Sequence, residues 1–243
     1  MLDKAGLTYK ALRCGCHAPR FTELSLAAPE GFVADERRNN CSGKHAGFLA
    51  YCVQHGHTLD DYIDPSHPLQ QAIRRDVARA TGTYENNLKM GIDGCSAPNY
   101  AMPLAHLARG YARLASGARD AEFGEGFALL GEAMTAHPDM VCGTGRNDLA
   151  FMRAGRGDWV TKVGADGVQV VGSKSRGEAL AIKLMDANKP ALFAATVEAL
   201  DPLGWLDDAQ RAELTPWRAQ RIVNAQGMLV GQRLPASRLQ AAR

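Results

Sequence analysis

The chain has 243 residues, 46% of them hydrophobic and 22% charged, and a formal net charge of +2 at pH 7. This length is enough to bury a substantial core, and the composition is that of an ordinary globular protein. The balanced charge, with no basic patch interleaved with aromatic residues, argues against nucleic acid as a partner. No apolar run of about eighteen residues predicts a membrane span. The first residues lead into no signal-peptide core, so we expect a cytoplasmic protein without a membrane partner.

The first half of the chain is predicted to be helical. Residues 3–12 predict a short helix or two turns, and residues 42–55 predict the first long helix. A second helix opens at Pro68, and two more are expected over 99–116 and 121–137. The last two carry apolar stripes that we expect to be buried: Leu104, Leu107, Tyr111 and Leu114, then Phe127, Leu130 and Met134. Together these helices predict a packed helical lobe.

The second half changes to a strand pattern. Strands are predicted at 159–163, 168–171 and 180–184, followed by a helix from Lys189 to Leu200. Residues 221–224 and 228–234 predict a terminal hairpin around Gln226-Gly227. The sequence therefore predicts a mixed α/β fold in a single domain of residues 1–243. Its helical lobe would cover about 42–138, and residues 1–41 and 139–243 would form the region that contains the sheet.

Reactive side chains concentrate where the first long helix begins, at Cys41-Ser42-Gly43-Lys44-His45. Ser42 is expected to be the N-cap. Cys41 and Lys44 are three residues apart and so share a face of the first turn. A helix N-terminus and a neighbouring lysine both lower the pKa of a thiol, which predicts either a metal ligand or a nucleophile at Cys41. The alternative interpretation is a small buried cysteine beside a solvated lysine.

The number and spacing of the cysteines bear on whether the chain forms disulfides or a standard zinc site. The six cysteines at 14, 16, 41, 52, 95 and 142 are not expected to form a disulfide framework in a chain of this size without a secretory signal. No Cys-x-x-Cys pair marks a standard structural zinc site. Cys14-Gly15-Cys16-His17 is either a metal motif or, as we prefer, a turn entering an extended segment. Cys95 lies in a second tight turn, Gly91-Ile92-Asp93-Gly94-Cys95.

Two further segments are candidates for ligand binding or catalysis. The turn Gly143-Thr144-Gly145-Arg146 is either a backbone nest for an anion or a plain loop, and it lacks the ending of a nucleotide-binding P-loop. Lys162-Val163-Gly164 on a predicted strand is similar to the Lys-Thr-Gly element of β-lactamases. A lysine on a strand is otherwise most often a solvated edge residue.

Two of these segments, Asn39 to His45 and Gly91 to Pro98, match the motifs Asn-x-Cys-Ser-Gly-Lys-His and Gly-x-Asp-Gly-Cys-x-x-Pro. In order and spacing they resemble the rhizobial-type, or class 3, L-asparaginases of the asparaginase II family. That resemblance implies hydrolysis of L-asparagine to L-aspartate and ammonia, with one zinc ion held by Cys41, Lys44 and Cys95. It also implies a helical lobe packed on a mainly antiparallel sheet, similar to serine β-lactamases and glutaminases, and a homodimer.

The resemblance extends to other segments. It covers Cys14, His17 and Pro19 but not Cys16, which we do not assign as a ligand. It implies that Asp93 and His45 lie behind the zinc ligands or contact the substrate, and that Arg146 lies near the site. Lys162 would be a catalytic or orienting lysine. The catalytic candidates are therefore Lys162, Asp93 and His45, and the substrate-binding candidates are Arg146 and Asp93.

The match does not cover the N-terminal segment of the family, which supplies a Ser-x-x-Lys motif and a second serine. No serine in this chain precedes a lysine by three residues. We therefore expect an N-terminally truncated member whose turnover of asparagine or glutamine is open. Two alternatives remain from the residues present. Cys41, activated by Lys44, is the nucleophile of a cysteine-dependent amidase, or the chain is a non-catalytic zinc-binding remnant or partner subunit.

Overall fold

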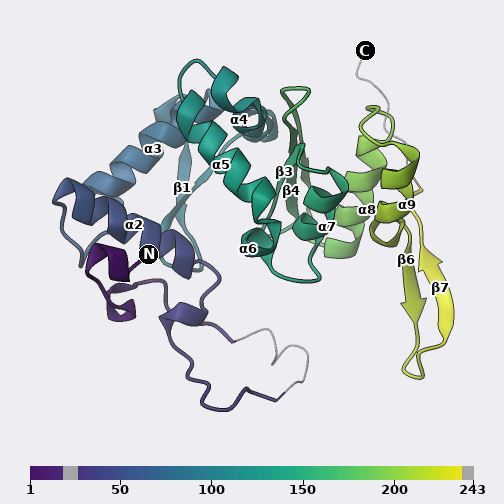
Figure 1. The fold of residues 1–243 in the computed structure, drawn as a ribbon, viewed down its shortest axis with the longest axis horizontal. Coiled ribbons are helices and arrows are strands. Elements are labelled where there is room, and N and C mark those ends of the chain that lie inside the picture. Colours follow the sequence, from purple (N-terminus) through teal and green to yellow (C-terminus); the bar gives the residue numbers. More distant parts are fainter. Residues whose placement is uncertain (19–26, 237–243) are drawn as a thin grey trace. The chain divides into compact units, whose positions relative to one another are not determined.

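The computed structural model describes residues 1–18 and 27–236, and the chain divides into two compact units (Figure 1). The first unit comprises Met1–Arg79 and Thr83–Met102, and the second comprises Ala80–Gly82 and Pro103–Arg243. The mixed α/β class expected from the sequence is confirmed, whereas the predicted single domain, with its boundaries for a helical lobe and a sheet region, stays a prediction. Pro19 lies outside the described residues.

The first unit is built from two helices and a short hairpin. Its elements are the 3₁₀ helices η1 (Asp3–Ala5), η2 (Tyr9–Ala11), η3 (Glu36–Arg38) and η4 (Glu85–Asn87), the helices α2 (Ser42–His55) and α3 (Pro68–Thr81), and the antiparallel strands β1 (Lys89–Ile92) and β2 (Pro98–Ala101). The predictions of α2 and α3 are confirmed, because apolar periodicity and the left-handed glycine after α2 mark them clearly. Residues 3–12 form two separate turns.

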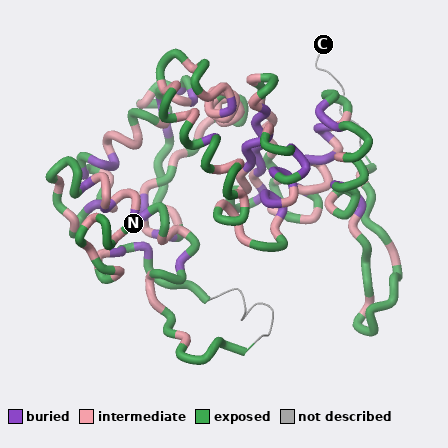
Figure 2. The backbone as a smooth tube through the Cα atoms, viewed as in Figure 1, coloured by how far each residue is buried: buried purple, intermediate pink, exposed green. Residues whose placement is uncertain are grey.

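A small core holds the first unit together. Its buried members are Leu12, Cys14, Leu49, Cys52, Tyr62, Leu69, Cys95 and Ala97. Leu49, Cys52 and Tyr62 have no exposed surface at all. These residues come from the N-terminal segment, from both helices, from the connection between the helices (Tyr62) and from the β1–β2 turn. The buried segments can be followed in Figure 2. The core therefore fixes segments that are far apart in sequence, two of which carry the cysteine motifs.

The second unit is centred on a three-stranded antiparallel sheet. Its strands are β3 (Trp159–Gly164), β4 (Val168–Ser173) and β5 (Glu178–Lys183), in the order β3-β4-β5, and they pair Lys162 with Val170 and Val171 with Leu180. The helix α4 (Leu104–Ser116) packs on β4 and β5, and α7 (Asn147–Ala154) packs on β3 (Figure 1). Gly172 permits the close approach of α4, because a Cβ there would lie 2.9 Å from the Tyr111 carbonyl oxygen.

The second unit contains further helices and a hairpin, of which α8 (Lys189–Leu200) and α9 (Asp208–Arg218) contribute to its core. The others are η5 (Gly117–Arg119), α5 (Gly124–Ala136), α6 (Pro138–Cys142) and the hairpin β6 (Gln220–Val223) with β7 (Leu229–Arg233). The core includes Phe151, Trp159, Val171, Leu200 and Leu214. The predicted strands, α5, α8 and the terminal hairpin are confirmed, whereas α9 was not predicted.

Three local predictions are wrong. The third helix begins at Leu104 rather than near residue 99, because Pro98–Ala101 pairs with β1 and Pro103 has the extended backbone of an N-cap. Leu104 and Leu130, expected to be buried, are 41% and 54% exposed. Ser42 is the first helical residue rather than the cap, and its hydroxyl donates to the Arg37 carbonyl oxygen (3.3 Å).

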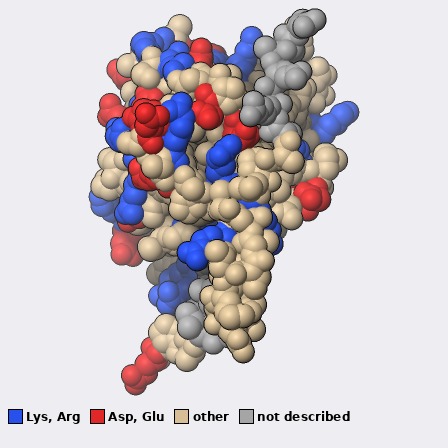
Figure 3. Space-filling model, turned by 90° about the vertical axis from the view of Figure 1, so that its right-hand side faces the viewer, with Lys and Arg blue, Asp and Glu red and all other residues tan. Residues whose placement is uncertain are grey.

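The surface agrees with the balanced net charge. On the face drawn in Figure 3, basic and acidic side chains are interspersed rather than gathered into a patch of one sign. Among residues 1–18 and 27–236, no helix combines the length and the apolar character needed to cross a bilayer.

Candidate metal and active site

Cys41 is held by its own neighbours at the start of α2. Its N–H donates to Oδ1 of Asn39 (2.8 Å), and the Nδ2 of the same amide donates to the Cys14 carbonyl oxygen (2.8 Å). Asn39 is buried, so this bridge is shielded from water. Lys44 follows Cys41 by about one helical turn. The local sequence thus fixes the backbone of Cys41 and directs Lys44 to the same side of the helix.

The β1–β2 turn supplies the second set of donors. The Asp93 N–H donates to the Ala97 carbonyl oxygen (2.8 Å), the Ser96 N–H donates to the Asp93 carbonyl oxygen (2.9 Å), and the Gly94 N–H donates to the Asp93 carboxylate (2.7 Å). Ser96 takes a positive φ of 69° to close the turn. Cys95 is buried at its tip. The turn therefore presents a carboxylate and a thiol two residues apart.

The two segments converge. Three potential ligand atoms lie within 4.8 Å of one another: the Cys41 sulfur, the Cys95 sulfur and an Asp93 carboxylate oxygen. Together they form a group able to hold a metal ion. The Lys44 Nζ lies 3.7 Å from Asp93 Oδ2, and the Cys95 Sγ lies 3.7 Å from the same oxygen. The structure thus brings together the three predicted zinc ligands, and it adds Asp93 to their immediate surroundings.

The protonation states of these groups differ from the sequence expectation. Burial raises the pKa of the Cys41 thiol above its usual value, and the opposing influence of Lys44 is smaller. Burial acts to lower the pKa of Lys44, but the Cys95 and Cys41 thiols and the Asp93 carboxylate outweigh it, so that pKa is raised. The prediction of a lowered thiol pKa is therefore wrong, because desolvation dominates. A metal ion bound here must displace protons.

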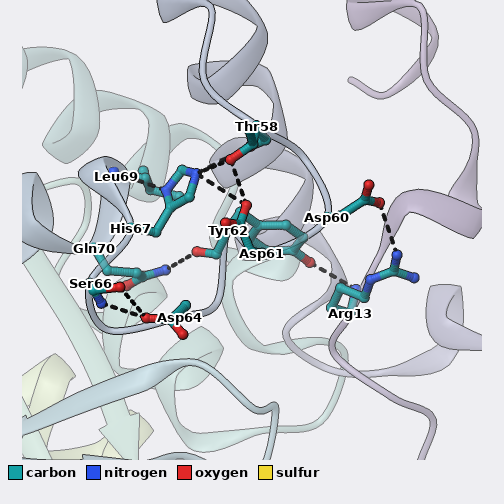
Figure 4. Close-up of polar contacts among 10 residues, drawn as sticks. All are labelled: Arg13, Thr58, Asp60, Asp61, Tyr62, Asp64, Ser66, His67, Leu69 and Gln70. Atoms are coloured by element: carbon teal, nitrogen blue, oxygen red, sulfur yellow. Dashed lines mark hydrogen bonds and ion pairs between the residues drawn. The ribbon is translucent and has the colours of Figure 1, made fainter.

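His45 lies directly behind this group and is fully buried. Its Nδ1 is 2.6 Å from the Tyr62 hydroxyl. The same hydroxyl accepts the Arg13 N–H (2.8 Å), a contact drawn in Figure 4. The hydroxyl hydrogen is therefore assigned toward Nδ1, which leaves the proton on Nε2, and Nε2 has no partner among the described residues. Burial, reinforced by Lys44, lowers the pKa of His45 to about 4. The ring is neutral at pH 7.

Arg146 and Lys162 belong to the second unit. Arg146 is the N-cap residue of α7 and follows Gly143 and Gly145, both with positive φ. Lys162 lies on β3, and its Nζ donates to the Val163 carbonyl oxygen (2.7 Å). Burial raises the pKa of the Cys142 thiol, while Arg146 and Lys162 both act to lower it. The glycine-rich turn and β3 thus bring both cations near one thiol.

The sequence did not identify Cys142 or Asp148 as site residues. The Cys142 sulfur accepts the Leu149 N–H (3.1 Å) at the start of α7. Asp148 is a fully buried carboxylate on the same helix. Neither residue belongs to a recognisable spacing motif, although Asp148 closely follows the glycine-rich turn that the sequence did single out.

Comparison with known proteins identifies one family. The family model described as L-asparaginase II matches residues 1–234 of the chain. A search of curated proteins found no significant match to the chain.

Proposed function

The chain belongs to the L-asparaginase II family, and on that premise we propose that it is an amidohydrolase that converts L-asparagine to L-aspartate and ammonia. The observation that carries the proposal is the convergence of Cys41, Lys44, Asp93 and Cys95 from two segments separated by a whole helical region. These are the segments whose motifs resemble the family's zinc site.

Zinc is the metal that this donor set fits best. Thiolates are soft ligands that favour zinc, and a nitrogen ligand from Lys44 would complete a Cys/Lys/Cys set with an open fourth position. Bound there, zinc would act as a Lewis acid toward a carboxylate or carbonyl oxygen of the substrate. Lys44 forms the ion pair with Asp93 only while it is protonated, so binding zinc through its nitrogen would require the loss of this proton.

Arg146 and Lys162 are assigned the substrate-binding and proton-transfer roles. The Arg146 guanidinium makes no hydrogen bond or ion pair with any described residue, so it is available to a substrate carboxylate. Among the described residues, the Lys162 Nζ donates only to the backbone carbonyl oxygen of Val163.

A cysteine-dependent amidase is the weaker alternative. Its nucleophile would be Cys41, but burial raises the pKa of this thiol, so that little thiolate forms at neutral pH. A non-catalytic zinc-binding chain differs from the proposal only in turnover.

The test measures ammonia release and zinc content on the same purified sample. Cys95→Ala should lose both the bound zinc and the turnover of asparagine. Cys16→Ala, which removes an exposed thiol whose one hydrogen bond among the described residues goes to the His17 carbonyl oxygen, should keep both. Unchanged zinc content in Cys95→Ala would contradict the assigned site. Bound zinc without turnover in the unsubstituted chain would identify a non-catalytic zinc protein instead.

A further inference from the structure

Asp148 is a carboxylate buried in the second unit without an ion-pair partner among the described residues. Its Oδ2 accepts the Val163 N–H (2.8 Å). Its Oδ1 accepts from the Thr161 hydroxyl (3.1 Å), the Gln169 amide (2.9 Å) and the Asn147 amide (3.2 Å). Burying a carboxylate costs free energy unless hydrogen bonds replace its water. Four donors at both oxygens satisfy that requirement here.

Two of these donors are the neighbours of Lys162, to which a proton-transfer role is assigned. Thr161 and Val163 flank Lys162 on β3, which is the outer strand of its sheet. Asp148 thus fastens α7 to the strand that carries Lys162. The Val163 backbone is held at its N–H by Asp148 and at its carbonyl by the Lys162 ammonium (2.7 Å).

The geometry of the strand indicates that Asp148 affects Lys162 indirectly and does not itself take part in the reaction. Side chains alternate between the two faces of a strand, so Lys162 points to the opposite face from Thr161 and Val163. Asp148 contacts the strand from the latter side and therefore acts on Lys162 through the backbone. Asp148 also lies two residues after Arg146, so the same carboxylate ties the glycine-rich turn to β3.

We propose that Asp148 is a positioning residue that fixes Lys162 and Arg146 relative to each other by locking the N-terminus of α7 onto β3. The catalytic meaning of this lock rests on the proposed function, because that function assigns proton transfer to Lys162. The lock itself is a separate claim that can be measured without turnover.

The substitution Asp148→Asn isolates the lock because it keeps the shape of the side chain. Both carboxylate oxygens accept hydrogen bonds. An amide group replaces one of them by a donor, which then faces either the Val163 N–H or the three donors at the Oδ1 position. Either orientation sets donor against donor.

Asp158→Asn is the matched control. Asp158 precedes the other end of β3, where its carboxylate accepts from the Ser173 hydroxyl (2.7 Å) and the Ser175 N–H (2.6 Å). This variant also removes a hydrogen-bonded carboxylate beside the same strand. It leaves the contacts around Lys162 intact.

The experiment measures the acylation rate of Lys162 by a limiting N-hydroxysuccinimide ester and mass spectrometry, relative to exposed Lys189. Loss of a hydrogen bond to a charged acceptor should raise this ratio about tenfold in Asp148→Asn. The ratio should be unchanged in Asp158→Asn. An unchanged ratio in a folded Asp148→Asn, or an equal rise in both variants, would overturn the proposal.

A second variant provides the test if Asp148→Asn does not fold. Thr161→Val keeps the strand and removes one donor to the same carboxylate. It should raise the ratio in the same direction by a smaller factor, and no rise would count against the lock. Turnover is measured in parallel. In an active chain kcat should fall in Asp148→Asn but not in Asp158→Asn, with equal zinc content. An inactive unsubstituted chain refutes the proposed function, while the acylation ratio still decides the lock.

Discussion

The substitution Tyr62→Phe tests whether a buried hydroxyl orients the histidine behind the proposed metal site. Tyr62 is fully buried, and its hydroxyl joins the Arg13 N–H to the Nδ1 of His45. It is the one hydrogen-bond partner of the His45 ring among the described residues, because Nε2 has none. Figure 4 shows the ring of Tyr62 directed at the Arg13 backbone. Phenylalanine keeps the packing and removes only the oxygen.

The expected cost follows from the two broken hydrogen bonds. An unsatisfied polar atom in the interior costs about 1–3 kcal/mol, and an ordinary hydrogen bond contributes about 1 kcal/mol. His45 Nδ1 is fully buried and takes the first penalty, whereas the Arg13 N–H is only partly buried. We therefore expect the free energy of unfolding to fall by roughly 2–4 kcal/mol.

Urea unfolding monitored by circular dichroism measures this loss, with the metal removed by a chelator. Tyr84→Phe is the control, because Tyr84 is 82% exposed and its substitution should have no effect. The reasoning is refuted if Tyr62→Phe and Tyr84→Phe have the same free energy of unfolding. In that case, the hydroxyl does not support His45.

Two further predictions concern the second unit. Hydrogen bonds from Arg113 lower the pKa of Asp120 to about 2 against the effect of its burial, so Asp120 stabilises the fold above pH ~4 and loses this contribution as pH falls toward 2. Asp120→Asn should lower the free energy of unfolding at pH 7 by about 2 kcal/mol, and unfolding curves of both proteins should converge near pH 2. Gly155→Ala should cost about 1–3 kcal/mol and alter the near-UV circular dichroism, because the new Cβ would lie 2.5 Å from Trp159 Cγ. Gly126→Ala on exposed helix, with no atom in the way, should be harmless by both measurements.

The fold was predictable where local signals agreed with packing. The helix α2 has apolar residues at helical spacing and a left-handed glycine at its end, and its bounds were predicted correctly. The strand β1 has four exposed residues, so no alternation of buried and exposed positions marks it. The helix α9 contains Pro216 in its interior, which works against a helix prediction. The signal that favours this helix is a capping box at Asp207 and Gln210, which the prediction from sequence did not use.

The candidate site was predictable only to a limited extent. The identities of Cys41, Lys44 and Cys95 came from motif resemblance, since nothing in their spacing shows that a hairpin turn meets a helix start. The pKa direction of Cys41 was wrong because the degree of burial is a tertiary property. Asp148 bonds to residues 13 to 21 positions away, and no local sequence window reveals such a network.

The segment Cys14 to His17 shows how a metal-like motif can serve as a scaffold. The Cys14 thiol donates to the Glu36 carbonyl oxygen (3.4 Å), and its carbonyl accepts from Asn39. The His17 Nε2 lies 3.0 Å from both the Asn40 backbone nitrogen and the Asn40 Oδ1, and its Nδ1 lies 2.9 Å from the Ala18 carbonyl oxygen. Both residues thus brace the backbone just before Cys41, as the turn interpretation of this segment anticipates. The segment supports the proposed ligands without supplying one.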